Sequence, residues 1–290
     1  MAKDFIVAIE LGSSKMTGIA GRKNPDGSIS ILAVAKEDSA SYIRKGVAYN
    51  IERTAQGLSN IVSKLKNTLK TEIEQVYVGI GGQSIHSVKN SIVKELPLDC
   101  IVSQDMVNEL MDTNRSMEYK DCEILDAITQ EYNVDGHYED DPVGIQARHL
   151  EGNFLNVLWR RSFYRNLNKS LDNSGIKVAE MYLAPLTMAD CVLTDAEKRA
   201  GCVLVDLGAD TTTVSVYYRN KLRHIAVLPL GGSNVTKDLE SLQIDEINAE
   251  AMKLKHASAL TDEKDIDADA TLPIGDGRTI RSCMFIQVVE

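Results

Sequence analysis

Two short stretches of the chain place an acidic residue at the end of an apolar run, directly before a leucine and a glycine. The first is IELGSSK, in which Glu10 precedes Gly12, and the second is VDLGADTTT, in which Asp206 precedes Gly208. An ordinary tight turn requires no acid at that point. A carboxylate there is suited to positioning the water ligands of a magnesium ion, which commonly keeps several waters.

The residues that follow each acid are suited to binding phosphate. The glycine lets the backbone approach a ligand closely, and the next backbone amides can point into one concavity. Small serine and threonine side chains add hydroxyl donors without blocking access, and Lys15 is placed to neutralise a terminal phosphate as a point charge. Two such hairpins facing each other across a cleft would hold a polyphosphate from both sides.

Similar elements surround both stretches. The first lies between the apolar run FIVAIE and the alternating run KMTGIAGR, which continues through the turn NPDG into a third strand, SISILAVAKE. The second also continues into an alternating strand and, after a tight turn, a third strand. Repetition of the whole pattern at a long interval predicts a duplicated molecule with two equivalent lobes, each carrying one phosphate-binding hairpin.

Helices are expected between and after the two hairpins. A long helix is predicted by apolar residues that share one helical face: Leu58, Ile61, Val62, Leu65 and Leu69. Further helices are predicted over residues 161–174, with Gly175 as the cap, and over residues 186–200 as one element closed by Gly201. Beyond the second hairpin we expect helices over residues 233–242 and 245–260, then a polar connection that ends in a hairpin at Gly275 to Gly277.

Residues 85–163 have a different sequence pattern from the rest, with strand-like runs around one helical segment, and are predicted to form a small α+β insertion. Its helix is expected to be capped by Ser103 or Asp105, and Trp159 is expected to anchor the insertion to its lobe. Two charged features have two interpretations each. The acidic loop HYEDDPVG (residues 137–144) is a binding surface or a solvated loop tip, and Arg160 with Arg161 makes a filament contact or a solvated edge.

The composition excludes several classes of function. The net charge of −10 over 290 residues disfavours nucleic acid as a partner, because phosphate backbones require a basic footprint. The five cysteines show no ligand-like spacing, so neither a zinc site nor a disulfide framework is indicated, and reduced thiols in the cytoplasm are expected. No apolar run approaches the ~20 residues of a membrane-spanning helix, and the N-terminus does not resemble a signal peptide.

The paired hairpins resemble the two phosphate-binding loops of the superfamily that contains actin, the sugar kinases and the heat-shock-chaperone ATPases. Within it, the chain resembles the FtsA family of actin-like bacterial cell-division proteins. The segments that carry this resemblance are KGVAYNIERTAQGLSNIV, VYVGIGGQSIHSVKNS, ITQEYNVDGHYEDDPVG, APLTMADCVLTDAEKRAG and LPLGGSNVTKDL. The resemblance extends to about His256, and an insertion at this point of the fold is distinctive of FtsA.

The resemblance implies an α/β, actin-like (ribonuclease H-like) fold with two lobes and a small inserted α+β subdomain. The expected parts are a first lobe at 1–84 and 164–199, the insertion at 85–163, a partial core of the second lobe at 200–240, and its small subdomain at 241–290. The glycine-rich adenosine-binding segment of the family has no counterpart here, since no glycine follows Gly277. We therefore expect a truncated second lobe, and weak or absent ATP binding by these residues alone.

The resemblance also implies a site for ATP and magnesium. Glu10 and Asp206 would face the metal through water, although the superfamily usually has the shorter aspartate where Glu10 stands. The nucleotide-binding residues would be Gly12, Ser13, Ser14 and Lys15 in the first loop, Gly208, Ala209, Asp210, Thr211 and Thr212 in the second, and Gly231 and Gly232 at a helix N-terminus. Ala209 and Asp210 occupy positions often held by glycine, and Asp210 would either repel a γ-phosphate or orient the metal.

As for function, the resemblance implies a cytoplasmic protein at the inner face of the cell membrane at the division site. It would bind the C-terminal tail of FtsZ, polymerise into filaments, and reach the membrane only through a C-terminal helix absent from this chain. ATP hydrolysis would be slow at most. Two alternatives stay open: a scaffold of the same fold that works without nucleotide, and a sugar-kinase-type phosphotransferase with Asp190 or Asp195 as its base.

Overall fold

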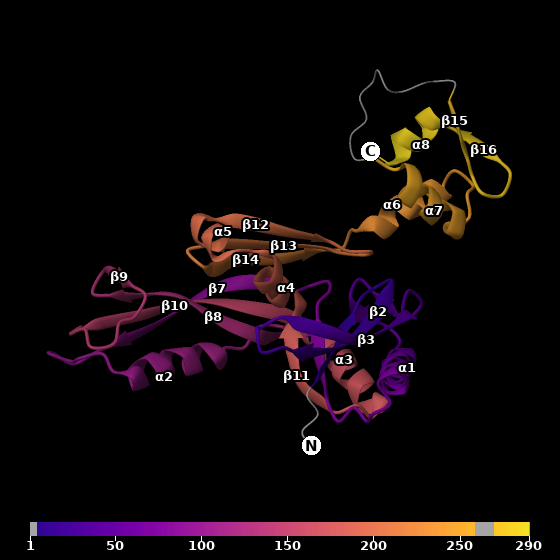
Figure 1. The fold of residues 1–290 in the computed structure, drawn as a ribbon. Coiled ribbons are helices and arrows are strands. Elements are labelled where there is room, and N and C mark those ends of the chain that lie inside the picture. The colour runs from indigo at the N-terminus through magenta and orange to yellow at the C-terminus, as the bar shows by residue number, and fades with distance from the viewer. Residues whose placement is uncertain (1–4, 259–269, 290) are drawn as a thin grey trace. The chain divides into compact units, whose positions relative to one another are not determined.

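In the computed structural model, which describes residues 5–258 and 270–289, the three strands expected at the start of the chain form an antiparallel meander (Figure 1). They are β1 (Ile6–Leu11), β2 (Lys15–Lys23) and β3 (Ile29–Asp38). Strands β6 (Val76–Ile80) and β11 (Val178–Leu183) extend the sheet in the order β11-β6-β1-β2-β3. Both added strands run parallel to β1, which requires crossover connections.

The first crossover contains the predicted long helix, α1 (Ile51–Leu69). Asn50 caps it, since the Asn50 side chain accepts a hydrogen bond from the Arg53 amide at 3.0 Å. The predicted apolar face packs against β2 and β3, where Leu58, Ile61 and Leu65 are fully buried. The second crossover includes α3 (Arg161–Ser174), which ends at Gly175 as predicted and packs beside α1. Two short strands, β4 (Ile43–Arg44) and β5 (Val47–Ala48), precede α1.

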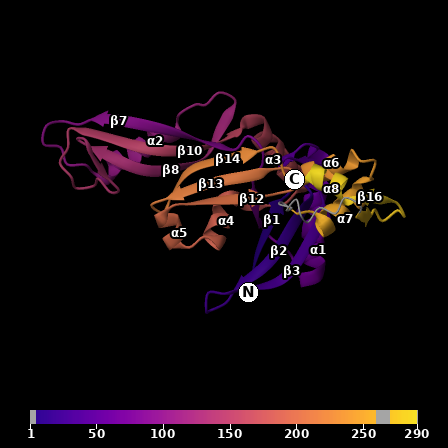
Figure 2. The same cartoon turned by 90° about the horizontal axis from the view of Figure 1, so that it is seen from above.

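A second sheet has seven strands in the order β12-β13-β14-β7-β10-β8-β9. Its insertion half contains β7 (His86–Glu95), β8 (Cys122–Val134), β9 (His137–Glu139) and β10 (His149–Arg160). Helix α2 (Gln104–Arg115), capped by Ser103, lies along β7, β8 and β10, as Figure 2 also shows. The other half contains β12 (Cys202–Leu207), β13 (Thr212–Tyr218) and β14 (Lys221–Leu228), the meander that follows the second acidic residue.

Trp159 joins the insertion to the first sheet, as predicted. The Trp159 side chain is fully buried in the cluster that contains the core of the five-stranded sheet, and its indole nitrogen donates a hydrogen bond to the Gln83 carbonyl at 3.0 Å. The far end of the insertion has a core of its own, in which Leu110, Leu150 and Phe154 are buried. The insertion therefore contributes to the core of the five-stranded sheet at one end and has a separate hydrophobic core at the other.

The single helix predicted over residues 186–200 is wrong. The structure contains two helices there, α4 (Ala184–Val192) and α5 (Asp195–Ala200), separated by Leu193 in extended backbone. Thr194 begins the second helix with a capping box: the Thr194 hydroxyl accepts from the Glu197 amide, and the Glu197 carboxylate accepts from the Thr194 amide. The sequence TDAE carries this start signal, which outweighs the continuous apolar pattern.

Contacts divide the chain into two compact units. Unit 1 is Met1–Asp206 with Thr211–Pro229, and unit 2 is Leu207–Asp210 with Leu230–Glu290. Apart from Leu207, strands β12 to β14 thus belong to unit 1, in one sheet with the insertion. The boundaries predicted from the sequence for the two lobes stay a prediction.

Unit 2 is built from short elements around a small core. It contains α6 (Gly232–Glu240), α7 (Glu246–His256), β15 (Thr271–Pro273), β16 (Thr279–Arg281) and α8 (Ser282–Val289). The hairpin expected at Gly275 to Gly277 is present between β15 and β16, whereas residues 259–269 of the predicted polar connection lie outside the described residues. The apolar last run forms α8 and buries Phe285 against Leu239 and Met252.

A close approach of two glycines supports the turn after β6. Gly82 has φ of +120°, and a Cβ there would lie 2.6 Å from the Gly46 carbonyl oxygen. We expect Gly82→Ala to lower the free energy of unfolding by about 2 kcal/mol or more, because backbone strain and overpacking add. Gly136→Ala is the matched control: Gly136 has φ of +92° with nothing within 4 Å, so its cost should be about 1 kcal/mol. Equal losses in denaturant unfolding would contradict the importance of the Gly46 contact.

Candidate functional site

The first predicted phosphate loop connects β1 to β2 and is held by hydrogen bonds from a neighbouring segment. The Ser39 hydroxyl donates to the Gly12 carbonyl at 2.6 Å, and the Ser39 amide donates to the Ser14 carbonyl at 3.2 Å. The Ser13 side chain is buried, and its hydroxyl accepts from the Gly46 amide at 2.8 Å. Ser13 thus braces the loop from inside.

The turn itself is tight, and its outer side chains are exposed. A Cβ on Gly12 would lie 2.5 Å from the Lys15 carbonyl oxygen, so only glycine fits at this position without a shift of the loop. Ser14 and Lys15 face solvent. The predicted hydroxyl and ammonium donors that remain accessible are therefore those of Ser14 and Lys15, whereas the Ser13 hydroxyl is already engaged.

Unit 1 brings the two predicted metal-facing acids close enough to interact. Partial desolvation raises the pKa of Glu10, the neighbouring Asp206 carboxylate raises it further, and Lys15 lowers it. Desolvation also raises the pKa of Asp206. Two carboxylates whose charged forms are disfavoured in the native structure, beside one ammonium group, form an anionic site that would gain from a bound cation.

The donor set fits magnesium held largely by water and ligand oxygens. Within the described ranges, 5–258 and 270–289, no three histidine, cysteine or acidic side chains are grouped so that they could hold a metal ion. Magnesium usually takes one or two carboxylates, several waters and the oxygens of a phosphate substrate. Glu10 and Asp206 are sufficient for that role.

The second predicted loop is shared between the two units. Thr211 and Thr212 belong to unit 1 with Asp206, whereas Gly208, Ala209 and Asp210 belong to unit 2 together with Gly231 and Gly232. The Gly232 amide donates to the Gly208 carbonyl at 3.0 Å, and the Ser233 amide donates to the Ala209 carbonyl at 2.7 Å. Residues 208–209 are thereby fastened to the first turn of α6.

Gly231 makes this attachment possible. A Cβ at Gly231 would lie 2.5 Å from the Ala209 oxygen and 2.6 Å from the Gly208 oxygen, which forbids any larger residue in this arrangement. The Gly231 amide donates to the Asn234 side chain at 3.0 Å. The helix N-terminus expected at Gly231 and Gly232 is present, and its first amides bind the loop in this structure.

A polar cluster in unit 2 was missed by the sequence analysis. The Lys253 ammonium on α7 donates to the Gly232 carbonyl at 3.0 Å, to the Thr236 hydroxyl at 2.9 Å and to the Glu250 carboxylate at 2.6 Å. Desolvation acts to raise the pKa of Glu250, but hydrogen bonds from Lys253 and Thr236 outweigh it, so that this pKa is lowered. The only sequence signal was an acid and a lysine three residues apart on one predicted helix.

The sheet order of unit 1 and the repeated acid-leucine-glycine turn define a protein of the actin-like fold. The solved PilM-PilN type IV pilus biogenesis complex matches with a TM-score of 0.59 and 14% identity, over 87% of this chain and 69% of that chain. MreB5 of Spiroplasma citri bound to ADP matches with a TM-score of 0.52 and 10% identity, over 99% of this chain and 74% of that one. The predicted fold class, actin-like with an inserted subdomain, is confirmed.

Two protein-family models match this chain. The model of the cell division protein FtsA matches residues 203–286, and the model of the SHS2 domain inserted in FtsA matches residues 82–158. The cell division protein FtsA of Porphyromonas gingivalis is 35% identical over 260 residues, which are 88% of this chain and 54% of that protein. The FtsA of Neisseria meningitidis is 29% identical over 281 residues, covering 96% of this chain and 67% of that protein. This chain belongs to the FtsA family of cell-division proteins.

The match leaves part of the relatives uncovered. The chain spans only about half (54%) of the length of the Porphyromonas gingivalis protein. No helix in the described part of the chain is both long and apolar enough to cross a membrane.

The pair of acids makes a prediction about stability and pH. The native fold raises the pKa of Asp206 above its value in the unfolded chain. The charged carboxylate therefore destabilises the native state at pH values above that pKa, and this cost disappears as the pH falls and the carboxylate is protonated. In metal-free buffer, Asp206→Asn should therefore raise the free energy of unfolding at neutral pH, by less than about 1 kcal/mol because the site is partly solvated. The difference should vanish in acid. Denaturant unfolding across pH measures it, with exposed Asp112→Asn as the control.

The Lys253 cluster makes a second prediction. Lys253→Met should lower the free energy of unfolding by about 1–3 kcal/mol, because Thr236 and Glu250 would lose a charged hydrogen-bond partner. Amide hydrogen exchange should rise at the first turn of α6, including Gly232. Lys255→Met, on an exposed position of the same helix, should leave exchange unchanged. If both variants exchange alike, Lys253 does not brace the loop.

Proposed function

We propose that this chain binds magnesium-ATP between its two acid-leucine-glycine hairpins and serves cell division as an actin-like, filament-forming adaptor. The observation that carries the proposal is the proximity of Glu10 and Asp206, from the ends of the first strands of the two equivalent meanders, with Lys15 beside them. Strands β1 and β12 lie in different sheets, so this convergence is a tertiary feature. Family membership supplies the cell-division context.

The residues of unit 1 have distinct parts in this proposal. Bound magnesium would neutralise the paired carboxylates and the phosphates, and Glu10 and Asp206 would orient its water ligands. Lys15 and the Ser14 hydroxyl, both exposed, would contact the outer phosphate oxygens. The bracing of Gly12 and Ser14 by Ser39 would hold the loop amides in place before the ligand arrives. Turnover in this proposal is slow at most, and we assign no residue to water activation.

The family also suggests the partners. We propose that the full protein binds the C-terminal tail of FtsZ, associates with itself into filaments, and acts at the cytoplasmic face of the cell membrane at the division site. Membrane contact would come from a C-terminal amphipathic helix, a role that we assign to none of the described residues.

One observation favours a nucleotide-independent scaffold as the second candidate. The amides of Gly232 and Ser233, which a nucleotide would use at a helix N-terminus, already donate to the Gly208 and Ala209 carbonyls. A sugar-kinase-type phosphotransferase receives no such support. Asp190 is exposed and pairs with Lys198 at 2.9 Å, and Asp195 lies exposed at the start of α5.

The decisive experiment is a calorimetric titration of magnesium-ATP into this chain. We expect measurable binding, weaker than micromolar, that Asp206→Asn weakens by about ten- to a hundredfold, the usual range for groups that orient a metal's ligands. Asp112→Asn, an exposed acid on α2, should bind like the wild type.

The outcomes separate the two candidates. Heat that depends on magnesium and is lost in Asp206→Asn supports the nucleotide clamp. Binding that is equal in the wild type and Asp206→Asn would exclude the paired acids as the metal site. Absence of binding at millimolar ATP would favour the scaffold.

A further inference from the structure

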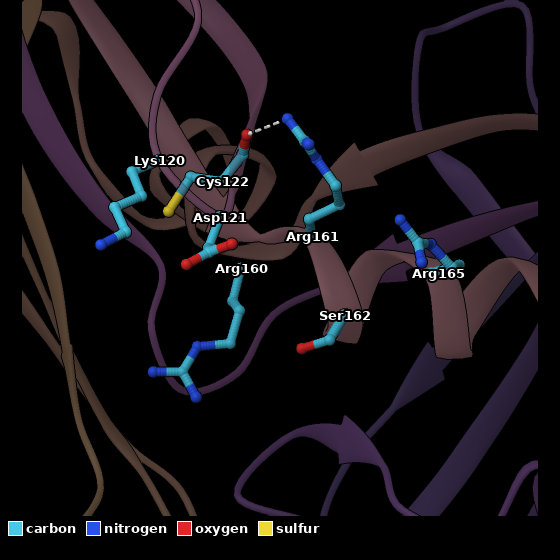
Figure 3. A pocket seen from close by; sticks show the side chains of 7 residues that line it. All are labelled: Lys120, Asp121, Cys122, Arg160, Arg161, Ser162 and Arg165. Atoms are coloured by element: carbon cyan, nitrogen blue, oxygen red, sulfur yellow. Dashed lines mark hydrogen bonds between the residues drawn. The ribbon is translucent and has the colours of Figure 1, made fainter.

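A basic pocket lies where the insertion meets α3. Its volume is about 540 Å³, and Figure 3 shows the side chains that surround it, from the segment before β8, the end of β10 and the first turns of α3. The lining residues are Lys120, Asp121, Cys122, Arg160, Arg161, Ser162 and Arg165. Four cationic side chains thus face one carboxylate, in a chain whose net charge is −10.

Only part of this positive charge is neutralised within the fold. Arg161 pairs with Glu123 at 2.7 Å and donates to the Cys122 carbonyl at 3.3 Å, the bond drawn in Figure 3. Across the described ranges, the side chains of Lys120 and Arg165 form no ion pair or hydrogen bond, and both residues are exposed. The Arg160 guanidinium lies 5.1 Å from the centre of the Phe163 ring, which leaves its charge available.

The first turn of α3 adds to the potential of this pocket. No side chain caps the helix at Arg160. The Arg161 amide donates to the Asp121 carbonyl at 2.8 Å, and the amides that follow it in the first turn carry partial positive charge, which adds to that of the arginine side chains. The pocket therefore has a positive potential that suits carboxylate groups.

The complementary feature is the acidic tip, residues 138–141, which comprises the last two residues of β9 and the two residues that follow it. Glu139, Asp140 and Asp141 are exposed in succession, after Tyr138, whose side chain is 67% exposed. Asp140 pairs with Lys221 at 2.6 Å, and Asp141 accepts from the Val143 amide at 3.1 Å, so the loop has a defined shape. Glu139 and Asp141 have no cationic partner in the part of the chain that the structure describes.

The pocket and the tip lie at separate positions along one rigid sheet. Cys122 at the pocket pairs with Arg160, and ten residues further along the same strand Tyr132 pairs with Glu139 at the tip. At ~3.3 Å per residue, ten residues of strand separate the two by about 33 Å. A tip therefore cannot reach the pocket of its own chain while the sheet is intact.

We propose that the acidic tip of one copy docks into the basic pocket of the next copy. The contact joins two different surfaces of the same chain, so it is heterologous and repeats head to tail. Because copies with a charge of −10 repel each other overall, a local match of opposite charges is needed to align them. This inference rests on the self-association proposed above, and it names the surfaces that make it.

Charge exchange between two variants tests the contact. The pocket variant is Lys120→Glu with Arg165→Glu, whose native side chains form no ion pair or hydrogen bond among the described residues, and the tip variant is Glu139→Lys with Asp141→Lys. Sedimentation velocity at low salt should show concentration-dependent assembly of the wild-type chain. Each variant alone should associate more than about tenfold more weakly, since like charges would face each other. An equal mixture should assemble again, because each reversed surface then finds its complement.

The controls isolate the contact from folding and from nucleotide. Lys169→Glu and Asp112→Lys, single exposed changes of the same sign as the pocket and tip variants, should assemble like the wild type, and circular dichroism melting should show that all variants fold. A wild-type chain that stays monomeric without nucleotide, or a mixture that fails to assemble, would overturn the inference. The wild type and both variants could also assemble equally well in magnesium-ATP. That result would overturn the docking of tip into pocket, but it would leave the proposed nucleotide function intact.

Discussion

The proximity of two carboxylates is the constraint around which unit 1 is organised. Glu10 and Asp206 come from strands of different sheets, and each stands before a glycine turn. Partial desolvation of Glu10 and the neighbouring Asp206 carboxylate both raise the pKa of Glu10, so the charged form of Glu10 is disfavoured in the native structure. Functional sites commonly keep such an interaction because a ligand relieves it, and this is the physical basis of the magnesium and phosphate site that we propose.

Hydrogen bonds from neighbouring segments hold the loops that follow these two acids. Ser39 and Gly46 bind the first loop through its carbonyls and the Ser13 hydroxyl, and the Gly46–Gly82 approach ties that brace to the turn after β6. The second loop is fastened to α6 by the Gly232 and Ser233 amides. The first loop is thus held by serine hydroxyls and backbone amides of unit 1, and residues 208–209 of the second loop are held by backbone amides of unit 2.

The insertion contributes surfaces of a different kind. Trp159 fixes it to the core of the first sheet, while β7 continues the sheet of β14. Its charged tip and pocket are placed by strand register, in which β8 runs from one to the other. A rigid spacer between complementary surfaces suits repeated head-to-tail contact.

The sequence alone determined the parts that depend on local pattern. The apolar face of α1, the cap at Gly175, the hairpin at Gly275 to Gly277 and the family itself were all readable, because side-chain periodicity and turn chemistry are encoded in neighbouring residues. The break between α4 and α5 was also encoded, in the capping box at Thr194, but the apolar pattern concealed it.

Tertiary structure alone decided which distant groups meet. The sequence could not show that the Ser13 hydroxyl turns inward to Gly46, that Lys253 braces Gly232, or that the amides of α6 bind the second loop. Nor could it show that Arg160 and Arg165 share a pocket with Lys120. These contacts join residues far apart in the chain, and their partners are selected by the packing of whole elements, which no local pattern records.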